Sequence, residues 1–390
     1  MIYVYISFYI FVFLKQFYFF KSGGIQPGDI FFLLSFILIL FRRDKVKGLR
    51  IRKIDNSIIM FTGFVICINL FYAVIYGKVE FLSSTFHYIF ILLLVILFRE
   101  LIEDDRFNTG LLKVLKVNLI SQLLIFITNT GRSYMGIRYM GSFNDPNQLA
   151  FFIYSTLMLI VLISKVINKK VESIYHLIAI FLIFKSSSTG MFLALTIFYS
   201  FNVIYLTIKR GVNIRIKRKS VIIYILLINI ACIFIANNYK KIDSNFVNIP
   251  IIQRVKEKIK KIGNEGDGES YDRQSIIQER SIDKLLLYPE QMIWGAGQGY
   301  YARFDKAAYK GEIHSTLPSI AFCYGIIPTI LIIIWIMKNI KGVSIEIYII
   351  IMSLVIESFV LLNQRQPFFW MIFILSYLYK KKNSISMNVY

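Results

Sequence analysis

Side chains suited to chemistry on a phosphate group gather in three short polar stretches between apolar runs. These are the turn GSFNDPNQLA (141–150) with its upstream arginines, the stretch SYDRQS (270–275), and the stretch GEIHSTLPS (311–319). The residues of interest are Arg132, Arg138, Asn147, Arg273, Glu312 and His314. A guanidinium stays charged and offers a rigid fork that matches phosphate oxygens, and a neutral imidazole can accept a proton. Together they could bind an anionic ligand and move a proton beside it.

Each of these residues also has an ordinary structural interpretation. Asp145 fits a helix N-cap and Pro146 the first helical position, so the turn could simply begin a helix. Both turn arginines could reach lipid head groups, and Arg273 could pair with a neighbouring acid. His314 could be an interfacial residue, with the next serine, Ser315, capping the following helix. The capping and charge interpretations are compatible, because a cap can fix the position of an arginine.

Other motifs carry less chemistry. GAGQG (295–299) has no strand before it, so it predicts a flexible turn that allows close backbone approach rather than a dinucleotide site. His87 and His176 lie in or near apolar runs and are interpreted as packing residues. No carboxylate pair has convincing metal spacing, and we expect neither a metal nor another cofactor.

The elements that must position these residues are membrane helices. Of 390 residues, 56% are hydrophobic and only 17% are charged, below the share usual in soluble domains. The net charge of +22 comes largely from short loops on alternate sides of apolar runs, which is the positive-inside pattern. We therefore expect an all-α, polytopic integral membrane protein forming one domain over 1–390, and no nucleic-acid partner.

Twelve spans can be drawn, with both termini on the basic, cytoplasmic side. Between the ninth and tenth lies a long, partly helical external loop, 238–313. The spans are 2–20, 27–41, 57–76, 82–98, 109–129, 147–166, 173–184, 190–207, 220–237, 315–337, 345–362 and 367–379.

These pieces together resemble the O-antigen polymerase and O-antigen ligase superfamily of bacterial envelope glycosyltransferases. IRYMGSFNDPNQLA is similar to the family's arginine followed by Gly-x-Phe-x-x-Pro-Asn, and SSSTGMFLAL to its Ser/Thr-Gly helix start. YDRQSIIQERSIDKLLLYPEQMIWGAGQGYY resembles its external-loop segment, and IHSTLPSIAFCYG its histidine motif. Serine after the histidine and the long gap from Pro289 to Gly295 depart from the family pattern.

The resemblance implies a metal-independent, inverting glycosyl transfer in the bacterial inner membrane, at its outer face. The donor would be a glycan on undecaprenyl pyrophosphate and the acceptor another glycan, with a flippase and a chain-length regulator as expected partners. Arg138 and Arg273 match the arginines that bind pyrophosphate, and His314 the histidine at the reacting centre. His314 is the first candidate for the general base and Glu312 the second, with Asn147 and Arg132 as further substrate contacts.

Three functions remain open at this point. The leading prediction is a polymerase that joins repeat units into O-antigen, capsule or exopolysaccharide. A ligase that moves glycan to lipid A-core or to a protein would share the chemistry. A flippase is less favoured, because it should carry charges along a path inside the bundle, whereas here the polar residues cluster outside the spans.

Overall fold

A computed structural model describes residues 1–20, 26–41, 49–209, 276–307 and 309–387 of the chain. Within these residues the fold is almost entirely helical, with one two-stranded hairpin. In the part of the chain that the structure describes, five helices are long and apolar enough to cross a membrane, and four shorter apolar helices accompany them. The all-α prediction is thus confirmed at this level, and the number of twelve spans stays a prediction.

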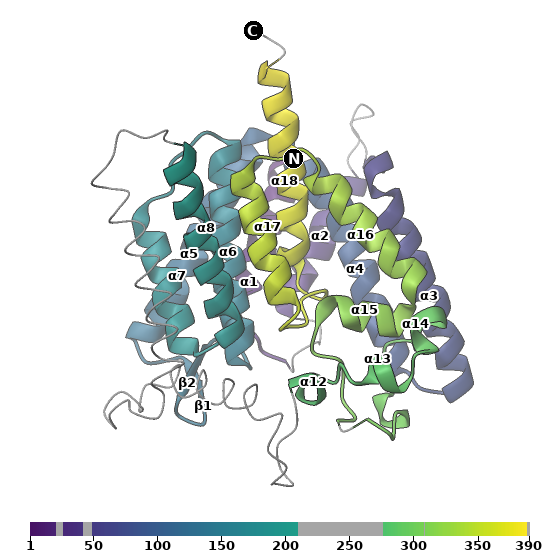
Figure 1. Cartoon of the computed structure of the whole chain (residues 1–390). Helices are drawn as coiled ribbons and strands as arrows, with labels where there is room; N and C mark the ends of the chain where they lie inside the picture. Colours follow the sequence, from purple (N-terminus) through teal and green to yellow (C-terminus); the bar gives the residue numbers. More distant parts are fainter. Residues whose placement is uncertain (21–25, 42–48, 210–275, 308, 388–390) are drawn as a thin grey trace.

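The elements follow in chain order (Figure 1). They are α1 (Ile2–Leu14), α2 (Pro27–Leu40), η1 (Lys53–Asp55), α3 (Asn56–Tyr76), α4 (Glu80–Leu101), α5 (Asp105–Ile127), β1 (Arg132–Tyr134), β2 (Arg138–Gly141), α6 (Pro146–Val166), α7 (Ser173–Ser186), α8 (Thr189–Lys209), α12 (Ile276–Glu279), α13 (Lys284–Leu287), α14 (Gln291–Trp294), η2 (Tyr301–Arg303), α15 (Thr316–Tyr324), α16 (Ile326–Ile340), α17 (Ile345–Ser358) and α18 (Pro367–Met387).

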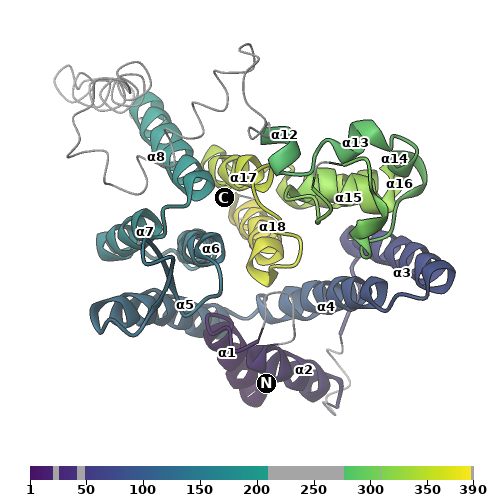
Figure 2. The ribbon, with the colours of Figure 1, turned by 90° about the horizontal axis from the view of Figure 1, so that it is seen from below.

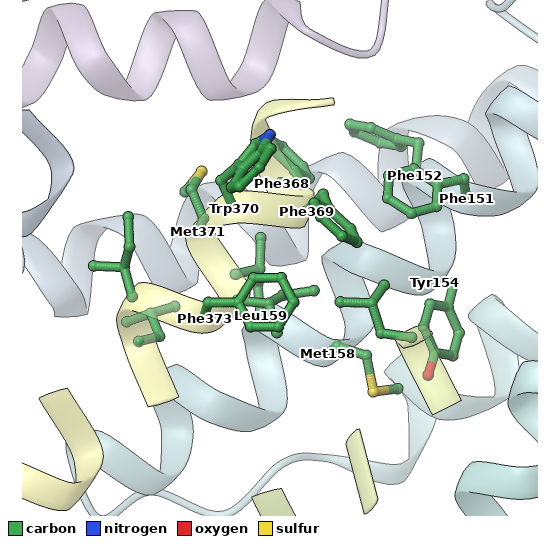
Figure 3. Packing of buried hydrophobic residues seen from close by; sticks show 14 of the residues in the cluster. Phe151, Phe152, Tyr154, Met158, Leu159, Phe368, Phe369, Trp370, Met371 and Phe373 are labelled. Carbon is green, nitrogen blue, oxygen red and sulfur yellow. The ribbon is translucent and has the colours of Figure 1, made fainter. Parts of the chain in front are cut away.

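Helix α6 is the centre of the bundle. Its apolar window is 94% buried, as expected for a helix that is apolar on every side. Seen along the helices, α6 lies between α7 and α18 (Figure 2). Phe152 of α6 packs against Phe368 of α18 (Figure 3), with their ring centres 5.2 Å apart. This rigid centre supports the polar turn at which α6 begins.

The outer helices expose large apolar side chains. On α3, Phe71 is 60% exposed and Val74 is 82% exposed, and α2 and α4 show further examples. Exposed apolar side chains on helices that are long and apolar enough to cross a membrane fit contact with lipid. Figure 1 shows the C-terminus at the upper end of the bundle and the hairpin and α12–α14 at the lower end, called here the hairpin end.

A buried ion pair ties the other end of the bundle together. Arg99 of α4 donates to Asp55 at 2.7 Å and to Asn339 of α16 at 2.8 Å, and Trp335 donates its indole N–H to the same Asp55 oxygen at 2.9 Å. Burying charge is costly unless the charge is paired, so this cluster fixes α3, α4 and α16 against one another.

Two expected spans are shorter or broken in the structure. The run 2–20 is helical only to Leu14, about 20 Å at 1.5 Å per residue. The run 315–337 is interrupted at Gly325, whose φ of +81° suits glycine. A Cβ there would lie 2.5 Å from the Ile293 carbonyl oxygen, so close packing against α14 requires the glycine and divides α15 from α16. The expected span 220–237 lies outside the described residues.

Candidate functional site

The hairpin between α5 and α6 holds Arg138 in place. In the antiparallel pair β1–β2, Arg138 lies opposite Tyr134, and its side chain turns inward, 8% exposed. Its Nε donates to the Ser186 carbonyl oxygen at 3.1 Å, and its Nη2 to Asn147 Oδ1 at 3.0 Å. The guanidinium is therefore fixed between the end of α7 and the start of α6.

The start of α6 follows the capping prediction. Asp145 has extended backbone, and its side chain accepts hydrogen bonds from the backbone of Asn147 at 2.7 Å and of Gln148 at 3.2 Å. Pro146 occupies the first turn. The cap leaves the Asn147 amide oxygen directed at Arg138, so capping and arginine placement depend on the same turn.

Arg132 is placed differently. It is exposed on β1 and donates to the Tyr18 carbonyl oxygen and to Asn144 Oδ1. It is not among the residues that line the cavity described below. The structure therefore separates the two arginines of the turn, and only Arg138 joins the cavity.

A small polar pocket of about 40 Å³ adjoins Arg138 at the start of α8. Arg280 lines it from the loop after α12, together with Asn147 and the segment Ser187–Gly190. The Ser188 hydroxyl is buried there, with no hydrogen-bond partner among the residues that the structure describes. The first amides of any helix lack partners within it and favour anions. The pocket thus combines two guanidinium groups with a helix N-terminus, although Glu279 also lines it.

A cavity of about 1070 Å³ opens from the same place. Most of its apolar lining comes from α2 and α4: Leu33, Phe86, Ile89, Phe90 and Leu93, with Phe151 from α6. Polar side chains at the hairpin end line it as well: Arg138, Asn147, Arg280, Glu312, His314 and Arg365. This volume is at the upper end for ligand pockets. The structure brings together Arg138, Asn147, Glu312 and His314 from stretches far apart in the sequence.

The segment that carries His314 is fixed by backbone contacts. The His314 N–H donates to the Arg280 carbonyl oxygen at 3.0 Å, and Lys284 donates to the carbonyl oxygen of Gly311. Partial burial lowers the pKa of His314, and the neighbouring Glu312 carboxylate only partly opposes this. The imidazole is therefore neutral near pH 7 and can accept a proton.

Glu312 is already engaged. Its Oε1 accepts hydrogen bonds from Arg365 at 2.6 Å, from Tyr301 at 3.3 Å and from the Gln298 amide. Three donors converge on this one oxygen, so the Glu312 carboxylate holds Arg365 in place beside the cavity. Ser315 occupies the N-cap position of α15, but its hydroxyl bonds to the Ser358 carbonyl oxygen rather than capping the helix.

Several residues of the cavity, among them Arg280, Arg365 and His87, were not assigned to a site from the sequence. Arg280 belongs to the quoted external-loop segment and Arg365 to the short link between two expected spans, 345–362 and 367–379, and both line the cavity. His87, interpreted as a packing residue, also lines it, which corrects that interpretation. His176 does pack, with its Nδ1 2.8 Å from the Tyr199 hydroxyl. Arg273 lies outside the described residues.

The GAGQG segment packs closely against α15, as its glycines suggest. The backbone N–H groups of Ala296 and Gly297 donate to the carbonyl oxygens of Phe322 and Cys323 at 2.9 and 2.7 Å. A Cβ on Gly295 would lie 2.8 Å from the Cys323 oxygen. The segment is a structural support for α15 and does not line the cavity.

No group of three histidine, cysteine or acidic residues in the described ranges is arranged to hold a metal ion. Comparison with protein-family models and with curated proteins finds no match for this chain.

Proposed function

We propose that this chain is a glycosyltransferase of the bacterial inner membrane that polymerises undecaprenyl-pyrophosphate-linked repeat units into O-antigen, capsule or exopolysaccharide. The hairpin end would face outward and both termini the cytoplasm. The proposal joins the motif resemblance to the cavity, which has the size and mixed lining that an amphiphilic, phosphate-bearing substrate needs.

One observation carries the proposal: Arg138 and Arg280 converge with the N-terminus of α8 on a pocket beside an apolar-walled cavity. Pyrophosphate is an anion that bidentate guanidinium groups and helix N-termini both bind well. The attached polyprenyl chain would extend toward lipid along apolar side chains such as Leu33 of α2 and Leu93 of α4. Arg273 remains a proposed pyrophosphate ligand through the resemblance alone.

The reaction needs two events at one carbon. A hydroxyl of the acceptor glycan attacks the anomeric carbon, and the bond from that carbon to the pyrophosphate oxygen breaks on the opposite face, which inverts the configuration. The hydroxyl proton passes to the neutral His314 imidazole. Negative charge grows on the departing pyrophosphate, and Arg138, Arg280 and the α8 amides stabilise it because they are already in position.

Purified protein in lipid nanodiscs tests this directly. The substrate is lipid-linked repeat unit extracted from the cells that make the protein and radiolabelled in the glycan. We expect a ladder of longer lipid-linked glycans and release of undecaprenyl pyrophosphate, both lost in His314→Gln. Unchanged substrate with folded wild-type protein would reject the proposal.

The ligase is the nearest alternative, since it would use the same pocket and base. It differs in product, because the glycan would appear on lipid A-core or protein and no ladder would form on the polyprenyl carrier. Adding each acceptor to the nanodisc reaction separates the two.

A further inference from the structure

The wall of the cavity made by α1, α2 and α4 contains a second polar cluster, formed by Lys15, Asp29 and His87. Viewed along the helices, α2 and α4 lie on the other side of the bundle centre from α8 and α12 (Figure 2). The pyrophosphate pocket belongs to the α8 and α12 side. The cluster is thus separate from the proposed donor contacts while sharing their cavity.

The three side chains offer complementary hydrogen bonds. Lys15 donates to Asp29 Oδ1 at 2.7 Å, which leaves other donors on its ammonium group. His87 Nδ1 lies 2.9 Å from the Ser83 carbonyl oxygen. Because a carbonyl only accepts, Nδ1 carries the proton and Nε2 is an acceptor. A sugar hydroxyl is both donor and acceptor, so this pairing suits it.

A contribution to stability does not fully explain why Lys15 is paired with Asp29. Both side chains are little exposed, 12% and 11%, and partly buried pairs of this kind are often replaceable by apolar residues without loss of stability. Asp29 does have a structural task, since its second oxygen accepts the Gln26 N–H at 2.8 Å in a capping box. That task explains the carboxylate but not the lysine.

The neighbouring aromatic rings complete a carbohydrate-binding surface. Phe86 and Phe90 line the same wall, and the Lys15 ammonium lies 5.8 Å from the centre of the Phe90 ring. The C–H faces of pyranose rings pack on aromatic rings while their hydroxyls reach polar groups beside them. Pockets commonly pair an apolar lining with a few placed polar groups in this way.

We propose that Lys15, Asp29 and His87 bind the hydroxyl groups of the acceptor glycan, facing the donor pyrophosphate across the cavity. This inference rests on the proposed function, because it assigns the second substrate of that reaction. It makes the cluster a determinant of which repeat unit is extended, distinct from the residues that hold the leaving group.

Equilibrium binding to the purified full chain in nanodiscs tests the inference. One probe is oligosaccharide released by mild acid from the surface polysaccharide of the same cells, and the other is undecaprenyl pyrophosphate. The variants are His87→Phe and the double change Lys15→Met with Asp29→Asn, which keeps an acceptor for the cap. His176→Phe is the matched control, because His176 is outside the cavity.

We expect both cluster variants to weaken oligosaccharide binding at least tenfold, with undecaprenyl pyrophosphate binding and the control unchanged. Oligosaccharide that fails to bind wild-type protein, or that binds both variants equally well, overturns the inference. Failure of the proposed function looks different, because then undecaprenyl pyrophosphate does not bind or Arg138→Lys binds it normally. If one cluster variant does not fold, the other still decides.

Discussion

Replacing Arg138 by lysine keeps the charge and removes the fork. The arginine uses Nε and Nη2 to hold Ser186 and Asn147 at 3.1 and 3.0 Å, and from this position it lines the small polar pocket. A lysine ammonium cannot keep both contacts and also face the pocket. We expect the loss of one charge-assisted hydrogen bond to the leaving group, about 1.5–3 kcal/mol. That corresponds to a fall in kcat/KM of roughly 10- to 150-fold.

The assay is the nanodisc polymerisation reaction at limiting substrate, with Arg132→Lys as the matched control. Arg132 belongs to the same hairpin but is exposed and away from the cavity. Its replacement should change kcat/KM by no more than about twofold, since surface changes are usually worth 0.5 kcal/mol or less. Equal effects of the two replacements, with both proteins folded, would refute the assignment of Arg138 to the leaving group.

Four further outcomes are expected. His314→Gln should lower turnover by about 10²–10⁴-fold at normal protein level. In wild-type protein the lowered pKa of His314 keeps the ring neutral as pH falls, so kcat/KM should decline only below the usual histidine value; a decline beginning above pH 7 would contradict this. Gly190→Ala would place a Cβ 2.8 Å from Val360 Cγ1, so we expect about 1–3 kcal/mol of destabilisation, seen as a lower melting temperature that Val360→Ala restores. Arg99→Ala leaves the buried Asp55 carboxylate without its charge partner and should lower the stability by about 3–5 kcal/mol. The loss is measured as a smaller amount of monodisperse protein in size-exclusion chromatography. Arg99→Met combined with Asp55→Leu should recover most of the lost stability.

The N-terminal cap of α6 was predictable from the sequence next to it. Asp145 and Pro146 satisfy capping requirements that depend only on neighbouring residues, and the structure confirms both. The same turn placed Arg138 and Asn147 beside each other, because a cap fixes the side chains of the first helical turn. Apolar run length likewise located most of the helices.

Residues that depend on tertiary contacts were not predictable in this way. Nothing in the sequence next to Arg280 or Arg365 indicates a cavity, because only the folded chain brings their segments to it. His87 lies within an apolar run and looks like part of a span. The break at Gly325 arises because α14 packs closely against this position, and the hydrophobic pattern of the sequence does not predict that contact. The short strands at Arg132–Tyr134 and Arg138–Gly141 were also missed, because three or four residues are too few for an alternating pattern.

The central claim is that this chain extends glycans on undecaprenyl pyrophosphate. A gel profile of surface and lipid-linked glycan from cells lacking the protein, with and without the wild-type copy restored, tests it most directly. We expect single repeat units on the surface anchor and no ladder, with the ladder returning on restoration. A normal ladder in its absence would contradict the claim.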